Sequence, residues 1–163
     1  MKYVIVGGVT GGASAAARLR RLDEEADILI FDKSPHVSYS NCSLPYRLSE
    51  TIDETEKLIL NSPQKLKGMY NIETCVLSEV VSIDRKGKKV RVKDLVNQRE
   101  YEEHYDKLIL SPGAYAVVPP IKGIEGANLF TIKNVVDIDR FYTFLKTGDV
   151  KKVSVAGGRF IGV

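Results

Sequence analysis

Long apolar runs and concentrated basic charge are both missing from this sequence, and each absence excludes a class of function. No segment approaches the roughly 20 apolar residues of a membrane-spanning helix, and the apolar run at residues 3–6 is too short for the core of a signal peptide. The net charge is +3, from 24 basic and 21 acidic residues spread along the chain. The sequence therefore predicts a globular protein with no membrane or nucleic-acid partner.

Cysteine is also scarce. Cys42 and Cys75 lie 33 positions apart, without a CxxC or CxxxxC pair and without a histidine cluster, so we expect neither a metal site nor a local dithiol. A reducing, cytoplasmic setting is the default for such a chain, and there a cysteine is free or catalytic rather than half of a structural disulfide. Cys75 lies in an alternating segment, which favours a structural role.

What is present at the amino end has the order of a nucleotide-binding fold. Residues 2–6 form a β-branched run typical of a buried parallel strand, residues 13–22 favour a helix, and residues 27–31 form a second apolar run. This strand–helix–strand unit predicts an α/β fold, a Rossmann-like domain built on a parallel sheet.

The middle of the chain predicts shorter elements. We expect loops and short helices over residues 34–61, a helix over 63–70 with Ser62 as its N-cap, a strand at 108–110 and a helix over 134–146. Three alternating segments predict a small antiparallel meander: residues 73–83, 88–96 and 99–105.

The carboxyl end repeats the opening. Residues 152–156 predict a strand, and glycines follow it as they do at the start of the chain. We therefore expect residues 1–149 to be the first part of one nucleotide-binding domain and residues 150–163 to be the start of a second, left incomplete at Val163.

The turn after the first predicted strand, Gly7-Gly8-Val9-Thr10-Gly11-Gly12, has the features of a dinucleotide-binding loop. It fits GxGxxG at its first and last positions, with Val9 in the middle. Such a loop directs backbone N–H groups at a pyrophosphate from a helix amino end. Asp32 follows Gly12 by 20 residues, where a carboxylate accepts hydrogen bonds from a ribose diol. We expect a dinucleotide site, against the alternative of a structural turn.

Cys42 is the candidate nucleophile. It lies just before an expected helix start, where unpaired N–H groups and the helix dipole would stabilise a thiolate. A thiolate attacks a disulfide or a peroxide. The alternative from the residues alone is a small buried hydrophobic side chain.

Together these segments resemble the pyridine nucleotide-disulfide oxidoreductases with one active cysteine. The resemblance is carried by the glycine loop, by Asn41-Cys42-Ser43-Leu44-Pro45-Tyr46, and by Tyr105-Asp106-Lys107-Leu108-Ile109-Leu110-Ser111-Pro112-Gly113-Ala114. The cysteine segment is most similar to the coenzyme A-linked branch. The resemblance implies NAD(P)H-dependent, FAD-mediated reduction of a coenzyme A disulfide or related persulfide. An NADH oxidase or peroxidase that cycles Cys42 through sulfenic acid, and a non-catalytic nucleotide-binding module, are the alternatives.

The resemblance also implies site residues. Cys42 would carry the redox-active sulfur. The FAD contacts would be Gly7, Gly8, Val9, Thr10, Gly11, Gly12, Asp32, Lys33, Val80, Ser111, Pro112 and Gly113. The contacts to coenzyme A, or to another low-molecular-weight thiol or disulfide, would be Ser14, Arg18, Arg21, Ser38 and Asn41. Because Arg18 and Arg21 are three residues apart, they share a helix face, and paired guanidiniums suit phosphates.

Two features depart from the family pattern. Arg159 occupies the middle position of the second glycine motif, where its side chain would obstruct a nicotinamide cofactor. The chain also ends before the segments that complete the flavin domain and form the dimer in this family. We therefore expect little turnover from this chain alone. We also expect self-association, as a homodimer or by exchange of segments, because an incomplete sheet exposes an unpaired edge.

Overall fold

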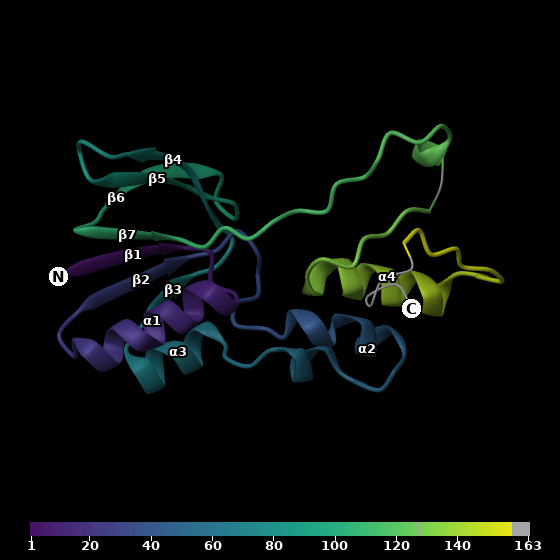
Figure 1. Cartoon of the computed structure of the whole chain (residues 1–163), viewed down its shortest axis with the longest axis horizontal. Helices are drawn as coiled ribbons and strands as arrows, with labels where there is room; N and C mark the ends of the chain where they lie inside the picture. The colour runs from purple at the N-terminus through teal and green to yellow at the C-terminus, as the bar shows by residue number, and fades with distance from the viewer. Residues whose placement is uncertain (127, 158–163) are drawn as a thin grey trace. The chain divides into compact units, whose positions relative to one another are not determined.

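The computed structural model describes residues 1–126 and 128–157. The chain divides into two compact units, one formed by Met1–Ser40 with Ile59–Ala114 and the other by Asn41–Leu58 with Tyr115–Val163 (Figure 1). This partition does not test the boundary expected at residue 150, which stays a prediction.

A parallel sheet is the centre of the first unit. Its strands are β1 (Lys2–Val6), β2 (Asp27–Phe31), β3 (Glu73–Cys75) and β7 (Lys107–Leu110), in the order β3-β2-β1-β7 (Figure 1). All three pairings are parallel, and Val4 faces Leu29 on one side and Leu108 on the other. The predictions of a parallel sheet and of its first two strands are confirmed. Self-association through an edge of the sheet stays a prediction.

The segment at residues 73–83 was expected to be one strand of the meander, and that expectation is wrong. It is split into β3, which joins the parallel sheet, and β4 (Ser78–Asp84), which begins the meander. The break lies at Leu77, whose φ of +50° is incompatible with a continuous strand. Alternation alone does not reveal such a turn.

The meander itself is confirmed. β4, β5 (Lys89–Asp94) and β6 (Arg99–His104) form an antiparallel sheet in that order. The turn between β5 and β6 is fixed by Asp94, whose carboxylate accepts hydrogen bonds from the side chain of Asn97 and from the N–H groups of Asn97 and Val96. These bonds lower the pKa of Asp94 to about 2.

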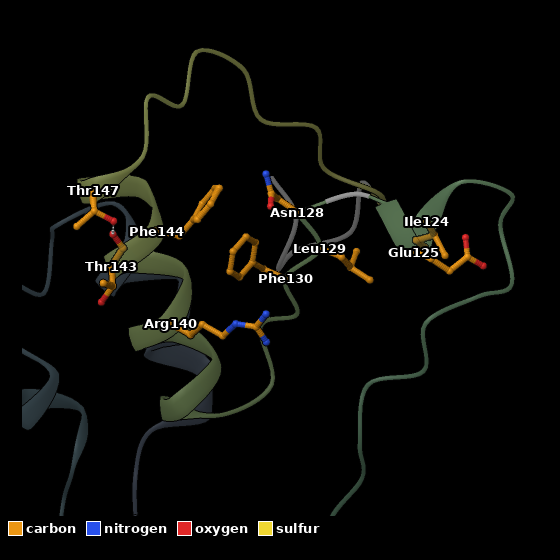
Figure 2. Close-up of a pocket in the computed structure, with 9 residues that line it drawn as sticks. All are labelled: Ile124, Glu125, Asn128, Leu129, Phe130, Arg140, Thr143, Phe144 and Thr147. Atoms are coloured by element: carbon orange, nitrogen blue, oxygen red, sulfur yellow. Dashed lines mark hydrogen bonds between the residues drawn. The ribbon is translucent and has the colours of Figure 1, made fainter.

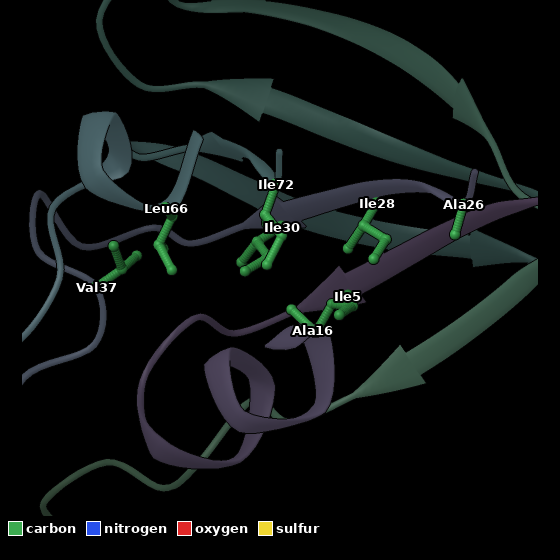
Figure 3. Packing of buried hydrophobic residues seen from close by; sticks show 8 residues of the cluster. All are labelled: Ile5, Ala16, Ala26, Ile28, Ile30, Val37, Leu66 and Ile72. Atoms are coloured by element: carbon green, nitrogen blue, oxygen red, sulfur yellow. The ribbon is translucent and has the colours of Figure 1, made fainter. Parts of the chain in front are cut away.

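Two apolar clusters pack the parallel sheet, one on each face. Figure 3 shows the first, to which α1 (Thr10–Leu22) and α3 (Pro63–Tyr70) contribute; its buried members are Ile5, Ala16, Ala26, Ile28, Ile30, Val37, Leu66 and Ile72. The second joins the parallel sheet to the meander through Val4, Leu29, Phe31, Val90 and Val92. Neighbours such as Val4 and Ile5 serve opposite faces because side chains alternate along a strand. The first unit therefore has three layers.

The helix ends follow the capping rules. α3 begins as predicted, with Pro63 in its first turn and the Ser62 hydroxyl accepting from the N–H of Lys65 at 3.2 Å. α1 begins at Thr10, earlier than the expected residue 13. The N–H of Ala13 donates to the carbonyl of Val9, so the glycines after Thr10 lie inside the first helical turn.

The second unit is mostly short turns. Its elements are η1 (Asn41–Ser43), α2 (Leu44–Leu48), η2 (Thr55–Leu58), η3 (Ile124–Gly126) and α4 (Val135–Thr147). The predicted helix over 134–146 is confirmed with Asn134 as its N-cap. The strand expected at residues 152–156 is wrong, because residues 150–157 are not extended in a sheet and no described strand pairs with them. Arg159 lies outside the described residues.

None of the described helices combines the length and apolar character needed to cross a membrane.

Arg20 is a structural residue that the sequence did not distinguish from Arg18 and Arg21. Its guanidinium donates to carbonyl groups just beyond α1 and at the end of α3: those of Asp23, Glu24, Tyr70 and Asn71. Carbonyls at a helix carboxyl end lack partners within the helix and interact favourably with a cation. Arg20 therefore ties the ends of two helices together.

We predict that Arg20→Ala lowers the free energy of unfolding by about 2 kcal/mol, because hydrogen bonds to charged groups contribute more than neutral ones. Denaturant unfolding followed by circular dichroism measures this change. Arg21→Ala is the matched control, since Arg21 is exposed, and it should stay within about 0.5 kcal/mol of wild type. Equal effects of the two substitutions would contradict the assignment.

Candidate nucleotide and thiol sites

The loops predicted to bind the nucleotide all follow carboxyl ends of adjacent parallel strands. The glycine loop follows β1, Asp32 follows β2 and Ser111 follows β7. The chain runs from β1 to β2 on one side, and β7 pairs on the other side of β1. In open α/β sheets, ligands bind outside the carboxyl ends of the strands where the strand order reverses in this way.

Gly7 and Gly12 are required by close backbone packing. A Cβ at Gly7, whose φ is +94°, would stand 2.0 Å from the carbonyl oxygen of Ser111, and a Cβ at Gly12 would stand 1.8 Å from the carbonyl oxygen of Gly7. Neither clash is relieved by rotating a side chain, because both partners are backbone atoms. The two glycines let α1 approach the end of β1 and let the Ser111 turn lie against Gly7.

Asp32 fixes the glycine loop from the end of β2. It is 8% exposed. One carboxylate oxygen accepts the N–H of Gly8 at 2.7 Å, and the other accepts the N–H of Ser34 at 2.8 Å. The contact to Gly8 adds a structural role that the sequence did not predict.

Ser38 and Asn61 support the same loop from outside it. The N–H of Ser38 donates to the carbonyl of Gly8 at 2.9 Å, and the Ser38 hydroxyl accepts from the Asn61 amide at 3.0 Å. Ser38 is buried and has a φ of +49°. Its expected contact with coenzyme A stays a prediction. Asn61 was not anticipated, because its partner lies 23 residues away and no local pattern marks it.

The amino end of α1 is suited to an anion. Val9 is its N-cap, and among the described residues no side chain accepts a hydrogen bond there and no acidic residue lies in the first turn. Thr10 and Gly11 are exposed. An uncapped helix amino end offers N–H donors and a positive dipole end to a phosphate. The glycine loop therefore fits the pyrophosphate of a dinucleotide.

The other predicted flavin contacts are Lys33, Val80, Pro112 and Gly113. Lys33 is exposed, with its ammonium 3.8 Å from a carboxylate oxygen of Glu79. Val80 is partly buried beside the second apolar cluster. Pro112 and Gly113 are exposed, and Gly113 has a φ of +70°. Their roles at a cofactor stay predictions.

The predicted thiol-substrate residues are divided between the units. Ser14, Arg18 and Arg21 are exposed on α1 in the first unit. Asn41 and Cys42 are exposed in η1 of the second unit. The exposure of Cys42 is compatible with the accessibility that a nucleophile requires.

Cys75 is in a different environment. It is partly buried at the end of β3, packed beside the second apolar cluster. Burial raises the pKa of its thiol above the ordinary value of 9.0, and the charges of Glu73 and Glu103 raise it further. A thiol held in its neutral form is a poor nucleophile. This environment accords with the expected structural role.

A pocket of about 560 Å³ lies in the second unit. Figure 2 shows its lining residues, which come from η3, from the segment before α4 and from α4: Ile124, Glu125, Asn128, Leu129, Phe130, Arg140, Thr143, Phe144 and Thr147. Phe130 is the centre of an aromatic group, 4.7 Å from Phe141 and 5.0 Å from Phe144 between ring centroids. None of the described site residues predicted from the sequence lines this pocket. Nor do the described residues contain a cluster of His, Cys, Asp or Glu that could hold a metal.

Comparisons with known proteins agree with the fold. The family model for pyridine nucleotide-disulphide oxidoreductases matches residues 1–163. A coenzyme A disulfide reductase from Staphylococcus aureus is 38% identical over 162 residues, which cover 99% of this chain and 36% of that protein. The chain thus spans about a third of the length of the curated relatives it matches.

Solved structures of similar fold include proteins with related names. Reduced CoADR-RHD from Bacillus anthracis has a TM-score of 0.87 and 45% identity, over 90% of this chain and 26% of that one. An NAD-dependent persulfide reductase from A. fulgidus has a TM-score of 0.85 and 30% identity, over 91% and 28%. A water-forming NADH oxidase from Lactobacillus brevis has a TM-score of 0.82 and 25% identity, over 90% and 32%.

We predict that Gly12→Ala lowers the free energy of unfolding by about 3 kcal/mol, because the added methyl group meets a backbone oxygen that cannot move away. Urea unfolding measures the change. Gly68→Ala is the control: a Cβ there meets nothing within 4 Å, and alanine is favoured over glycine in a helix by about 1 kcal/mol. Full stability of Gly12→Ala would refute the packing argument.

We also predict a pH effect from Cys75. Its raised folded-state pKa means that its contribution to stability is complete below the ordinary value of 9.0 and is lost as pH rises through the folded pKa. Wild type should therefore lose stability more steeply above pH 9 than Cys75→Ser. Denaturation midpoints across this range measure the difference, and parallel curves for the two proteins would disprove the effect.

Proposed function

Because the chain belongs to the pyridine nucleotide-disulphide oxidoreductase family, we propose that it supplies the FAD-binding part of an NAD(P)H-dependent reductase of coenzyme A disulfide or a related persulfide. Residues 1–149 would begin the FAD-binding domain, and residues 150–163 would begin the NAD(P)-binding domain. The observation that carries the proposal is the glycine loop, held by Asp32 and Ser111 beside the uncapped amino end of α1.

In this proposal the N–H groups of the first turn of α1 bind the FAD pyrophosphate, since those of Gly7 and Gly8 already donate to Phe31 and Asp32. Asp32 accepts one N–H on each carboxylate oxygen, and a carboxylate has about four acceptor positions. It therefore retains acceptor capacity for a ribose hydroxyl. Lys33 would lie at the ribose and Val80 near the adenine, while residues 111–113 would form the second flavin-side turn. When bound, FAD supplies the hydride-accepting redox chemistry that amino-acid side chains lack.

Cys42 is the proposed nucleophile. Its thiolate would attack one sulfur of the disulfide substrate, form a Cys42–thiol mixed disulfide and release the other sulfur as a thiolate that takes up a proton. Two electrons and a proton, derived from NAD(P)H, then release the second thiol and restore Cys42. The exposure of Cys42 supports this role, whereas Cys75 is partly buried with a raised thiol pKa.

Coenzyme A is the preferred thiol carrier in this proposal. Arg18 and Arg21 are exposed on one face of α1, near Ser14 on the same helix. Arg20, between them, is engaged with carbonyl groups and is not available in the same way. Two exposed guanidiniums suit the phosphates of coenzyme A. The 38% identity with a coenzyme A disulfide reductase supports the same substrate class.

A second candidate is an NADH oxidase or peroxidase, favoured by the likeness to the Lactobacillus brevis enzyme. The exposed Cys42 thiolate would then attack hydrogen peroxide, form a sulfenic acid and, with one proton, release water. Both candidates use the same sulfur, so its covalent adduct separates them.

We predict that the 163-residue chain, incubated with coenzyme A disulfide, acquires one coenzyme A on Cys42, detected by peptide mass. Cys42→Ser should abolish the adduct, and Cys75→Ser should retain it. The absence of a wild-type adduct would contradict the reductase proposal, and a trapped sulfenic acid after peroxide treatment would then favour the second candidate. Flavin fluorescence measured in parallel tests FAD binding. Binding that survives Cys42→Ser without thiol chemistry in wild type would indicate a non-catalytic module.

A further inference from the structure

Arg47 is a buried cation five residues after Cys42. It lies on α2, which follows the cysteine-bearing turn η1 without a break, and it is 8% exposed. Arginine is almost never so buried without partners, because removing its charge from water is costly. The contacts of Arg47 therefore show which residues stabilise the segment formed by η1 and α2.

The Arg47 guanidinium is held by α4. Its central carbon lies 3.7 Å from the ring centroid of Tyr142, a close cation–π contact. Its Nε donates to the Thr55 hydroxyl at 3.4 Å, and that hydroxyl donates to a carboxylate oxygen of Asp139. The Nη1 atom is buried and has no hydrogen-bond partner within the described residues. The cation–π contact with Tyr142 therefore offsets a large part of the cost of removing the guanidinium from water.

Tyr142 is also fixed from a second direction. Its hydroxyl donates to Glu50 at 3.1 Å, and Glu50 forms an ion pair with Lys146. The hydrogen bond from Lys146, followed by that from Tyr142, lowers the pKa of Glu50. The ring under Arg47 is thus held by a residue two positions beyond α2 as well as by α4 itself.

These contacts are needed because α2 is too short to be stable on its own. It has five residues, and isolated helices shorter than about 12 residues are marginal in water. α2 packs against α4, and Leu44 and Arg47 are its buried residues. Leu44 gives a non-directional apolar contact, whereas the stacked guanidinium restricts orientation. The orientation of the adjacent turn, which carries Cys42, follows from that of α2.

We propose that Arg47 is a positioning residue for Cys42: stacked on Tyr142 and linked through Thr55 to Asp139, it orients the cysteine-bearing turn for attack on a disulfide. The inference rests on the proposed function of Cys42. It assigns Arg47 no contact with the substrate.

Two reagents distinguish a change in the orientation of the Cys42 thiol from a change in its exposure. Iodoacetamide is small and reaches an exposed thiol in many orientations, whereas coenzyme A disulfide requires in-line approach to one sulfur. Arg47→Met keeps the approximate length of the side chain and removes its charge and planar group. We expect it to lower the ratio of the coenzyme A disulfide rate to the iodoacetamide rate at Cys42 by about tenfold, which corresponds to about 1.4 kcal/mol. Arg47→Lys, which keeps a cation over Tyr142, should restore part of this ratio.

Controls in the same unit test whether the effect is local. Arg140→Met removes an exposed arginine of α4 and should leave the ratio unchanged. Tyr142→Leu should lower the ratio, and the double variant with Arg47→Met should lower it no further, as expected for two residues of one contact. Hydrogen exchange of residues 41–48 should rise about tenfold in Arg47→Met, while exchange in β1 and β2 stays at its wild-type rate.

The outcomes distinguish the two proposals. A wild-type chain that forms no coenzyme A adduct overturns the function, and hydrogen exchange at residues 41–48 still decides whether Arg47 orders the turn. A wild-type chain that forms the adduct, with both ratio and exchange unchanged in Arg47→Met, overturns the positioning role. If Arg47→Met does not fold, Arg47→Lys and Tyr142→Leu carry the same measurements. The positioning role is also overturned if Arg47→Met lowers the coenzyme A disulfide rate and the iodoacetamide rate equally and raises hydrogen exchange throughout the first unit. That pattern would indicate general destabilisation of the protein.

Discussion

Gly7 leaves no room for a side chain, because the carbonyl group of Ser111 occupies the space where its Cβ would stand. The same is true of Gly12 against the carbonyl of Gly7. These two backbone contacts bring β1, α1 and the turn after β7 together at the carboxyl edge of the sheet. The proposed anion-binding geometry depends on them, since a helix displaced by a side chain would carry its N–H groups away from the loop. Packing and the proposed ligand recognition therefore require the same glycines.

Much of the first unit could be predicted because its signals are local. The β-branched runs of β1 and β2, the glycine loop and the Ser62 cap of α3 each act within a few residues, and the structure has them at or near the expected positions. β3 was assigned to the wrong sheet because it has three residues and its boundary depends on one left-handed residue, Leu77. The strand expected at residues 152–156 failed for a related reason: an apolar run becomes a strand only where another strand pairs with it.

The candidate site shows the same division. Motif and spacing predicted roles for Gly12, Asp32 and Cys42, and these roles stay predictions, whereas the contacts of Arg20, Arg47 and Asn61 were not predicted. On the sequence, Arg20 is equivalent to its neighbours Arg18 and Arg21, and only the distant carbonyls at the end of α3 distinguish it. The structural role of Arg47 likewise depends on its contact with Tyr142, which is 95 positions later on α4. Long-range partners of polar groups are what a single sequence does not reveal.

Asp32 forms hydrogen bonds through its carboxylate, its N–H and its carbonyl. Besides its carboxylate contacts, its N–H donates to the carbonyl of Cys75 in β3, and its carbonyl accepts from Ser78 at the start of β4. One residue thus connects the loop, the parallel sheet and the meander. A nucleotide that engages this carboxylate would consequently brace both sheets at once, and departure of the nucleotide would loosen them together. Occupancy of the site would then increase the rigidity of the whole three-layered unit, including β5 and β6, for which no contact with the ligand is predicted.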